Sequence, residues 1–347
     1  MKKIPERLNI ANLPTKIEEL TRFSAKIGGP TLYVKRDDQT GLELSGNKIR
    51  KLEYSLKEAV SMGADTLITC GGIQSNHCRA TAAAAAKLGL ESCLVLSGNE
   101  TEIPDGNHFL NLLFGAEINF ITQDEYTNSR MEIMQNINEK LSLQGKKGYV
   151  IPEGASNGIG SFGYFNAMEE IFSQEKELNI KFDAVVVAAG SGGTYAGLFH
   201  ANKINNNNAR IIGINVRNDD DGYFKDAISD ILHESFSYTD RMIDFTKDEI
   251  EIINGYVGDG YAMSRPVELE FIRELAKTEG IILDPVYTGK AMLGLVHEIK
   301  KGMFKDCKNV LFIHTGGLFG LFPKKNQFHF SWTHPEQIAP ETRRNYQ

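Results

Sequence analysis

Short runs of β-branched and other apolar residues alternate along this chain with longer segments in which apolar residues recur every three or four positions. The short runs predict buried strands, and the longer segments predict helices with one apolar face. Strands that alternate with helices in this way are typical of a parallel α/β fold. The expected strands are residues 66–70, 93–96, 118–121, 149–151, 184–188, 211–216 and 310–314.

The length of 347 residues is enough for one large or two ordinary domains, and we expect two. Small and polar residues cluster at 152–158, which favours a domain boundary there. After Pro323 the composition becomes polar. This end of the chain could be an arm packed on the surface or on a partner, or a loose tail.

Composition narrows the class of protein. The chain is 41% hydrophobic and 24% charged, which is the balance of a soluble globular protein. Its formal net charge of -7 comes without a long basic run, so a nucleic-acid partner is disfavoured. No apolar run approaches the ~20 residues of a membrane span, and the start of the chain lacks the apolar core of a signal peptide. We therefore expect a cytoplasmic protein, with its four cysteines reduced.

A lysine stands where a loop turns into a helix. Asn47 is a candidate N-cap, and Ile49, Leu52 and Leu56 recur behind it at helical spacing, so Lys48 falls in the first helical turn. The partial positive charge of a helix N-terminus disfavours an ammonium there. The amine is thus biased toward its neutral form, which suits Schiff-base chemistry with a carbonyl. The alternative is an ordinary solvated surface lysine.

Two loops between a strand and a helix have the composition of anion sites. In residues 71–77, paired glycines, the Ser75 hydroxyl and the Asn76 amide could hold a carboxylate or phosphate, although ordinary helix capping explains them too. Residues 190–194, Gly-Ser-Gly-Gly-Thr, offer backbone amides and two hydroxyls to one phosphate monoester. Tyr195 stands where a Rossmann motif has its third glycine, and no Gly-Lys-Ser/Thr follows, so a dinucleotide and a P-loop are disfavoured.

The lysine and the two loops together predict a pyridoxal 5′-phosphate enzyme. Lys48 would bind the aldehyde of the cofactor, residues 190–194 its phosphate, and the Ser75 loop the carboxylate of an amino-acid substrate. No metal site is expected, because the eight histidines show no metal-binding spacing.

The motifs that carry this chemistry also resemble a known family. Residues 45–48, 71–77, 190–194, 284–290 and 314–317 are similar to motifs of the D-cysteine desulfhydrase and 1-aminocyclopropane-1-carboxylate deaminase family. The resemblance covers about residues 5 to 322 and implies the tryptophan-synthase-β-like α/β fold, known as fold type II. It also implies a homodimer with the cofactor between two three-layer α/β/α domains. The smaller domain would be residues 51–158 and the larger one residues 1–50 plus 159–347.

The resemblance implies a role for each site residue. Catalytic roles fall to Lys48, Ser75, Tyr287 and Tyr261, with Tyr256 as the alternative to Tyr261. The substrate carboxylate would contact Ser75, Asn76 and His77. The cofactor would contact Lys48, Asn47, Asn76, Gly190, Ser191, Gly192, Gly193, Thr194, Thr288 and Thr315. Lys290 is a rival for the Schiff-base lysine, but a surface residue near a helix start is the favoured interpretation.

Two motifs favour the desulfhydrase branch. The deaminases have Pro-Val-Tyr-Glu and His-Leu-Gly-Gly, whereas this chain has Pro-Val-Tyr-Thr at 285–288 and His-Thr-Gly-Gly at 314–317. A threonine hydroxyl cannot hold the cofactor ring nitrogen protonated as a carboxylate would. The resulting weaker electron sink suits loss of a good leaving group such as thiolate. We therefore expect D-cysteine to be cleaved to pyruvate, hydrogen sulfide and ammonia, with Lys48 as the base.

Other functions stay open. The chain departs from the desulfhydrase pattern at 318–322 and at Glu153 and Ala155, which puts the substrate in doubt. A ring-opening deaminase is the nearest alternative. Elimination from another β-substituted amino acid, such as cysteate, would need much the same residues, and a cationic group near the leaving group would favour it. A protein that binds the cofactor or an amino acid without catalysis is disfavoured, and a metal hydrolase is weaker still.

Overall fold

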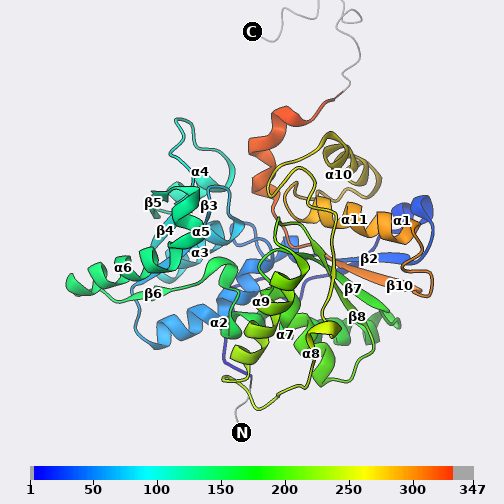
Figure 1. The fold of residues 1–347 in the computed structure, drawn as a ribbon, viewed down its shortest axis with the longest axis horizontal. Helices are drawn as coiled ribbons and strands as arrows, with labels where there is room; N and C mark the ends of the chain where they lie inside the picture. Colours follow the sequence, from blue (N-terminus) through cyan, green and yellow to red (C-terminus); the bar gives the residue numbers. More distant parts are fainter. Residues whose placement is uncertain (1–3, 331–347) are drawn as a thin grey trace, which may run out of the picture.

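The computed structural model describes residues 4–330, which are built around two β-sheets (Figure 1). The larger sheet has the strand order β1-β2-β10-β7-β8-β9, and its neighbouring strands are parallel except for β1 and β2. Its strands are β1 (Ile17–Glu19), β2 (Thr31–Lys35), β7 (Ala184–Ala189), β8 (Arg210–Asn215), β9 (Glu251–Ile253) and β10 (Asn309–Ile313).

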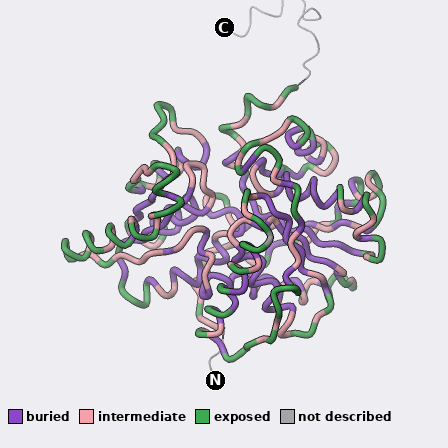
Figure 2. The backbone as a smooth tube through the Cα atoms, in the orientation of Figure 1, coloured by how far each residue is buried: buried purple, intermediate pink, exposed green. Residues whose placement is uncertain are grey.

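Helices cover both faces of the larger sheet, because successive residues of its strands point to opposite sides. Val186 and Ile212 pack with α1, α10 and α11 on one face, and Val185 and Ile211 pack with α7, α8 and α9 on the other. Figure 2 shows that the buried positions concentrate on the strands and the inner sides of these helices. These helices are α1 (Thr21–Ile27), α7 (Gly158–Leu178), α8 (Gly193–Ile204), α9 (Asp221–Ser235), α10 (Pro266–Glu279) and α11 (Thr288–Lys300).

The smaller sheet is all parallel, with the order β5-β4-β3-β6. Its strands are β3 (Thr66–Gly72), β4 (Glu91–Ser97), β5 (Glu117–Ile121) and β6 (Gly148–Val150). One face packs against α3 and the other against α5 and α6. The helices of this part are α2 (Asn47–Ser61), α3 (Asn76–Leu88), α4 (Gly106–Leu113), α5 (Gln123–Asn128) and α6 (Arg130–Leu143). Four 3₁₀ segments complete the chain, η1 (Asp37–Gln39), η2 (Glu153–Ala155), η3 (Lys247–Glu249) and η4 (Leu318–Gln327).

Each strand predicted from the sequence is present, with ends that differ by at most two residues. Strands β1, β2 and β9 were not predicted, because they are only three to five residues long and alternate too briefly to give a clear pattern. The four strands of the smaller sheet all lie within the predicted smaller domain. The predicted boundary after residue 50, however, falls inside the continuous helix α2, which packs Leu52 into one core and Tyr54 into another.

Two glycines allow the helices behind the site to pack in backbone contact. A Cβ atom at Gly163 of α7 would lie 2.5 Å from the carbonyl of Arg50 in α2, and one at Gly197 of α8 would lie 2.2 Å from the carbonyl oxygen of Ser161 in α7. A side chain at either position would therefore push the helices apart. This packing sets the start of α2 beside the start of α8.

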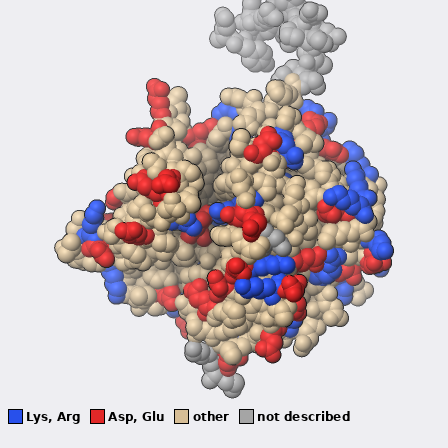
Figure 3. All heavy atoms as spheres, viewed as in Figure 1, with Lys and Arg blue, Asp and Glu red and all other residues tan. Residues whose placement is uncertain are grey.

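Charged side chains are distributed without a large patch of one sign on the face that Figure 3 shows, where acidic and basic groups are interspersed. Among the described residues, no helix is both long and apolar enough to cross a membrane.

Candidate active site

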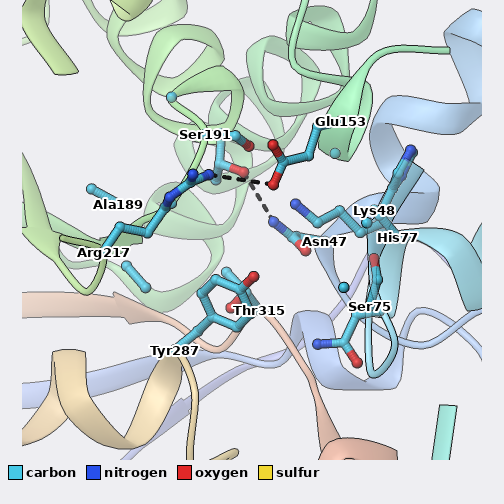
Figure 4. A pocket seen from close by; sticks show the side chains of 18 of the residues that line it. Asn47, Lys48, Ser75, His77, Glu153, Ala189, Ser191, Arg217, Tyr287 and Thr315 are labelled. Atoms are coloured by element: carbon cyan, nitrogen blue, oxygen red, sulfur yellow. Dashed lines mark hydrogen bonds and ion pairs between the residues drawn. The ribbon is translucent and has the colours of Figure 1, made fainter. Parts of the chain in front are cut away.

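A cavity opens where the carboxyl ends of β3, β7, β8 and β10 meet, and the loops after these strands line it (Figure 4). This edge is where parallel α/β sheets bind ligands, since the loops and helix N-termini converge there. The structure brings almost all residues of the predicted site into this one cavity.

Lys48 lies in the first turn of α2, as predicted, and lines the cavity. Asn47 is not the N-cap, because the helix begins at Asn47 itself and Gly46 precedes it with φ at +104°. The Asn47 amide instead donates to Thr194 Oγ1 at 3.0 Å, which ties α2 to α8. Burial lowers the pKa of Lys48 to about 8, although the nearby Glu153 carboxylate acts in the opposite direction. A larger share of its amine is therefore neutral at pH 7 than for a surface lysine.

Lys51, which the sequence analysis did not single out, lies one helical turn beyond Lys48. Its side chain is fully buried, and Nζ donates to Ser156 Oγ at 2.9 Å. Ser156 in turn lies 2.6 Å from Ser191 Oγ, so the amine reaches the glycine loop through one hydroxyl. Burial and the neighbouring Lys48 hold the pKa of Lys51 well below its ordinary value. A bound anion would relieve this cost, because it would favour the charged amine.

The glycine loop after β7 leaves space for that anion. Gly190 to Gly192 connect β7 to α8, whose exposed N–H groups begin at Gly193. A Cβ atom at Gly193 would lie 2.8 Å from Ser156 Oγ, and one at Gly190 would lie 3.2 Å from Tyr287 Cε1. Larger residues would thus fill the cradle. An amine suited to an aldehyde, a buried lysine and an open helix N-terminus fit pyridoxal 5′-phosphate.

The second anion loop follows β3. Ser75 is the N-cap of α3, and its hydroxyl oxygen accepts a hydrogen bond from the Cys78 backbone N–H at 3.2 Å. The capping alternative and the binding prediction are compatible, because capping uses a lone pair and leaves the hydroxyl proton for a ligand. Asn76 Oδ1 accepts a hydrogen bond from Asn107 Nδ2 at 2.8 Å, which fixes the Asn76 side chain at the cavity wall.

The His77 ring is not arranged as a cationic partner for a carboxylate. Its Nε2 lies 2.8 Å from Thr69 Oγ1, and this hydroxyl donates to the Ile151 carbonyl, so Nε2 is the protonated nitrogen. Burial, with Lys48 and Lys51 nearby, holds the pKa of His77 well below its ordinary value and keeps the ring neutral. The expected role in carboxylate binding can therefore come from the backbone N–H at the start of α3, but not from a charged ring.

Two tyrosines face the cavity, one from the segment before α10 and one from the segment before α11. The hydroxyls of Tyr261 and Tyr287 are hydrogen-bonded to each other, and their rings meet edge to face at 5.9 Å. Tyr261 is 41% exposed as a whole residue, but its hydroxyl is in the cavity beside that of Tyr287. Burial of the two hydroxyls raises the pKa of both tyrosines. The alternative, Tyr256, packs in the core and donates its hydroxyl proton to Glu298.

Lys290 is buried, and its predicted position at the surface is therefore wrong. Its Nζ donates to the carbonyls of Val257 at 2.6 Å and Gly260 at 2.8 Å. These bonds hold the loop that carries Tyr261. Lys290 is thus engaged away from the cavity that Lys48 lines.

The two threonines of the family motifs differ in position. Thr315 lines the cavity, but Thr288 does not. The Thr288 hydroxyl donates to Asp284 Oδ1 at 2.7 Å and accepts from the Asp284 backbone N–H at 2.7 Å. The cofactor contact of Thr288 stays a prediction, and its hydroxyl is engaged with Asp284 in this structure.

An ion pair in the cavity wall was also missed from the sequence. Arg217 follows β8, and its Nη1 lies 3.3 Å from Glu153 Oε1 (Figure 4). A signal was available, because Arg217 follows a predicted strand at the same sheet edge as the glycine loop. Within residues 4–330, no group of three histidine, cysteine, aspartate or glutamate residues is placed to hold a metal ion.

Comparisons with known proteins bear on this site. The family model described as pyridoxal-phosphate dependent enzyme matches residues 8–316. The chain is 44% identical over 331 residues to a bifunctional D-cysteine desulfhydrase/1-aminocyclopropane-1-carboxylate deaminase of Arabidopsis thaliana, covering 92% of this chain and 80% of that protein. It is 39% identical over 321 residues to a D-cysteine desulfhydrase of Klebsiella pneumoniae, covering 91% and 95% of the two chains.

Solved structures agree with these sequence relatives. A crystal structure described as an ACC deaminase homologue, ACC being 1-aminocyclopropane-1-carboxylate, matches with a TM-score of 0.85 and 39% identity. That match covers 93% of this chain and 95% of the other. The crystal structure of an O-ureido-L-serine synthase matches with a TM-score of 0.65 at 16% identity, which shows a shared fold.

Proposed function

We propose a function from the premise that this chain belongs to the pyridoxal-phosphate dependent enzyme family, and to its branch of D-cysteine desulfhydrases and 1-aminocyclopropane-1-carboxylate deaminases. This membership confirms the predicted fold type II and the predicted cofactor. The proposed reaction is α,β-elimination from D-cysteine, which consumes water and gives pyruvate, hydrogen sulfide and ammonia.

The observation that supports this proposal most is the position of Lys48. Its amine, with a pKa of about 8, lies in the same cavity as the Ser75 loop and the glycine loop. A Cβ atom at Gly154 would lie 3.1 Å from Lys48 Nζ, so the opposite wall leaves just enough room for the amine. An enzyme of this class needs these groups together, whereas a carrier of the cofactor has no need of a substrate-carboxylate loop.

Separate groups of the chain would bind the cofactor aldehyde, the cofactor phosphate and the substrate carboxylate. When bound, pyridoxal 5′-phosphate supplies an aldehyde that combines with amines and a ring that withdraws electrons from the substrate α-carbon. Lys48 would hold the aldehyde, and Lys51, Ser191 and the N–H groups at the start of α8 would hold the phosphate. The Ser75 hydroxyl and the N–H groups at the start of α3 would orient the substrate carboxylate.

Proton movement falls to Lys48 and the paired tyrosines. A base acts best when its pKa is near the working pH, and Lys48 Nζ meets this condition as the acceptor of the α-proton. Tyr287 and Tyr261 have raised pKa values, so their hydroxyls stay protonated at neutral pH. Either hydroxyl of this pair can then donate a proton to the departing sulfur, which leaves as hydrogen sulfide.

Ring opening of 1-aminocyclopropane-1-carboxylate is the second candidate, because the names of the relatives include both activities. The cavity supports D-cysteine for a physical reason. Thr315 offers a hydroxyl, and the carboxylate among the described lining residues is that of Glu153, which is paired with Arg217. A ring nitrogen without a carboxylate partner is less protonated, and this favours a substrate with a good leaving group.

The test is to supply the protein, loaded with pyridoxal 5′-phosphate, with D-cysteine, L-cysteine and 1-aminocyclopropane-1-carboxylate separately. Sulfide, pyruvate and ammonia are measured. We expect sulfide and pyruvate in equal amounts from D-cysteine, little from L-cysteine, and little ammonia from the cyclopropane. Ammonia from the cyclopropane without sulfide from D-cysteine would replace the proposal with the deaminase.

We also propose that the protein is a homodimer, as the resemblance implies. Large apolar side chains are exposed on α4 and the adjoining η4, namely Phe109, Leu112, Leu113 and Phe322. Such a patch is typical of a protein interface. Light scattering should give twice the 38.6 kDa of one chain, and a mass of one chain would contradict the proposal.

A further inference from the structure

Arg217 brings a cation to the part of the cavity that holds the paired tyrosines. Its side chain is only 22% exposed, and its guanidinium carbon lies 5.6 Å from the centre of the Tyr261 ring. Figure 4 shows the guanidinium pointing toward Glu153, on the side of the cavity opposite Ser75. The cavity therefore has a further group that can bind an anion, in addition to the glycine loop and the Ser75 loop.

The protein uses this guanidinium only in part. Its Nε lies 2.9 Å from Asp219 Oδ2, and its Nη1 donates to Glu153 Oε1 over a long 3.3 Å. Among the side-chain hydrogen bonds of residues 4–330, the one that Arg217 donates comes from Nη1, and none comes from Nη2. Glu153 is itself shared, because its Oε2 lies 4.0 Å from Arg130 Nη2. A guanidinium with a free edge can bind a carboxylate or sulfonate through two N–H groups.

The proposed function leaves this cation without a task. The cofactor phosphate would be held by Lys51 and the start of α8, and the substrate α-carboxylate by the Ser75 loop. The thiol of D-cysteine is small and largely uncharged at neutral pH, so it does not need an arginine for binding. Glu153 and Asp219 offset part of the hydration that this partly buried cation loses, and an anionic ligand would offset more of it.

We propose that Arg217 is a specificity residue that binds an anionic group on the β-carbon of the substrate, and that Glu153 occupies Arg217 until such a group displaces it. The inference rests on the proposed function, because it uses the same cavity and the same elimination. It extends the substrates to amino acids with a β-sulfonate, of which cysteate is the simplest. Sequence alone did not reveal the cation that this class of substrate requires.

Elimination from cysteate balances with the groups already described. The Cα–H bond breaks and its proton goes to Lys48 Nζ. The Cβ–S bond breaks with its electron pair on sulfur, and the group departs as sulfite. The remaining aminoacrylate takes up water and gives pyruvate and ammonia. No oxidant or reductant is needed.

Glu153 and the substrate anion compete for one guanidinium, so the two residues have opposite effects. Arg217→Gln removes the binding group and should weaken recognition of the anion. Glu153→Gln removes the competitor and should strengthen it. An ion pair that merely held η2 against the loop after β8 would behave differently, because breaking it from either side would do the same damage.

The experiment compares cysteate, in both enantiomers, with β-chloro-D-alanine, whose β-substituent is uncharged, on the enzyme loaded with pyridoxal 5′-phosphate. Pyruvate is measured for each, and the ratio of the kcat/KM values is compared among wild type, Arg217→Gln and Glu153→Gln. Loss of a hydrogen bond to a charged group should lower the ratio about 10- to 100-fold in Arg217→Gln. The ratio should rise severalfold in Glu153→Gln. A ratio unchanged in Arg217→Gln, or a change of the same sign in both variants, would overturn the proposal.

A binding measurement separates recognition from catalysis. The probe is 3-sulfopropanoate, which has the carboxylate and the sulfonate but no amine, and propanoate is its matched control. Calorimetry should show that Arg217→Gln weakens binding of 3-sulfopropanoate about 10-fold or more while propanoate changes little. Arg217→Lys, which keeps the charge, should recover part of the affinity if Arg217→Gln folds poorly. Equal affinity of wild type and both variants for 3-sulfopropanoate would contradict the proposal.

Failure of the inference differs from failure of the proposed function. Activity on β-chloro-D-alanine and D-cysteine with none on cysteate would leave the elimination in place and remove the role of Arg217. No pyruvate from any of these substrates would remove the elimination itself.

Discussion

Helix α2 separates two buried groups of charge that differ in how they are paired. On one side, Arg50 donates to both carboxylate oxygens of Asp37, each at 2.8 Å, and its other nitrogen lies 3.0 Å from Glu170. Lys35 and Tyr164 complete this group through Glu170 and Asp37. Two cations thus meet two carboxylates. Although burial opposes each charge, these partners raise the pKa of Arg50 and lower the pKa of Asp37.

On the other side of the helix, Lys48 and Lys51 lie close together, and no carboxylate of the described residues is in hydrogen-bond contact with either amine. Among the described residues, the hydrogen-bond partner of Lys51 is the neutral Ser156 hydroxyl. Burial lowers the pKa of both lysines, and each amine also interacts with the other.

This difference separates a structural role from a functional one. In the Arg50 group the cations and carboxylates are engaged with one another on every side, so this group leaves nothing for a ligand and holds β2, α2 and α7 together. Glu153 favours the charged form of Lys48 and Lys51, but it does not outweigh the cost of burying the two amines, and such groups cluster at functional sites. The sequence marks Lys48 by its place at a helix start, but it shows Arg50 and Lys51 as similar basic residues, and only their partners tell these two apart.

The largest effect on enzyme activity is expected at Lys48, one of the two lysines that lack a carboxylate partner. Lys48→Ala should lower sulfide release from D-cysteine about a thousandfold, because it removes both the amine that holds the cofactor aldehyde and the acceptor of the α-proton. Circular dichroism should show an unchanged fold. Lys57→Ala, on the same helix with an exposed partner in Glu6, is the matched control and should stay near wild-type activity. Wild-type release by Lys48→Ala would disprove the assignment.

Disrupting the Arg50 group, in which the charges are paired, should lower the stability of the protein. Arg50→Met leaves Asp37 and Glu170 without their shared cation, and the free energy of unfolding should fall by about 3–5 kcal/mol. Urea denaturation measures this fall. Lys26→Met is the control, because Lys26 and Glu274 form a surface ion pair and its loss should cost under about 1 kcal/mol. An equal fall in the free energy of unfolding in the two variants would show that the Arg50 group contributes no more to stability than a surface ion pair.

Lys51→Met should lower cofactor affinity without lowering the stability of the protein, in contrast to Arg50→Met. The cofactor-free protein should be as stable as wild type or more so, because an amine without an anion is no longer buried. The affinity for pyridoxal 5′-phosphate should fall about 10- to 100-fold, since the phosphate loses a charged hydrogen-bond donor. Titration of the cofactor with absorbance detection gives the affinity. A large loss of stability with unchanged affinity would assign Lys51 to the structural group.

The smallest expected effect is the dependence of the rate of cofactor attachment on pH. The pKa of Lys48 is lowered from 10.5 to about 8, so its amine is mostly protonated below pH 8 and mostly neutral above it. The rate at which cofactor-free protein attaches pyridoxal 5′-phosphate should therefore rise about 10-fold from pH 7 to pH 9 and then level off. Stopped-flow absorbance gives this rate, with a free lysine derivative as the control, whose rate should continue to rise toward pH 10.5. A protein rate that also continues to rise would contradict the lowered pKa.

Much of the fold was predictable, because the strands that face helices on both sides are continuous apolar runs. Strand 309–313 is buried along its whole length and strand 184–189 everywhere except at Ala188, so both stand out in the sequence. Strand β9 is a three-residue edge strand that gave no comparable signal. The candidate site was predictable in the same uneven way, since the glycine loops and Lys48 have local signatures, whereas Lys51 and Arg217 are ordinary basic residues in their local context.

The sequence by itself determined the alternation of strands and helices, the two anion loops and the lysine at a helix start. These are local properties, because glycine content, capping residues and apolar spacing act within a few residues of chain. The tertiary structure decided which groups meet. It brought Tyr261 to Tyr287 while Tyr256 packed in the core, buried Lys290 under a loop, used the Thr288 hydroxyl within the protein and set Arg217 across the cavity from the Ser75 loop. These outcomes depend on contacts between residues far apart in the chain, and the burial and charge that such contacts create fix the chemistry of each side chain.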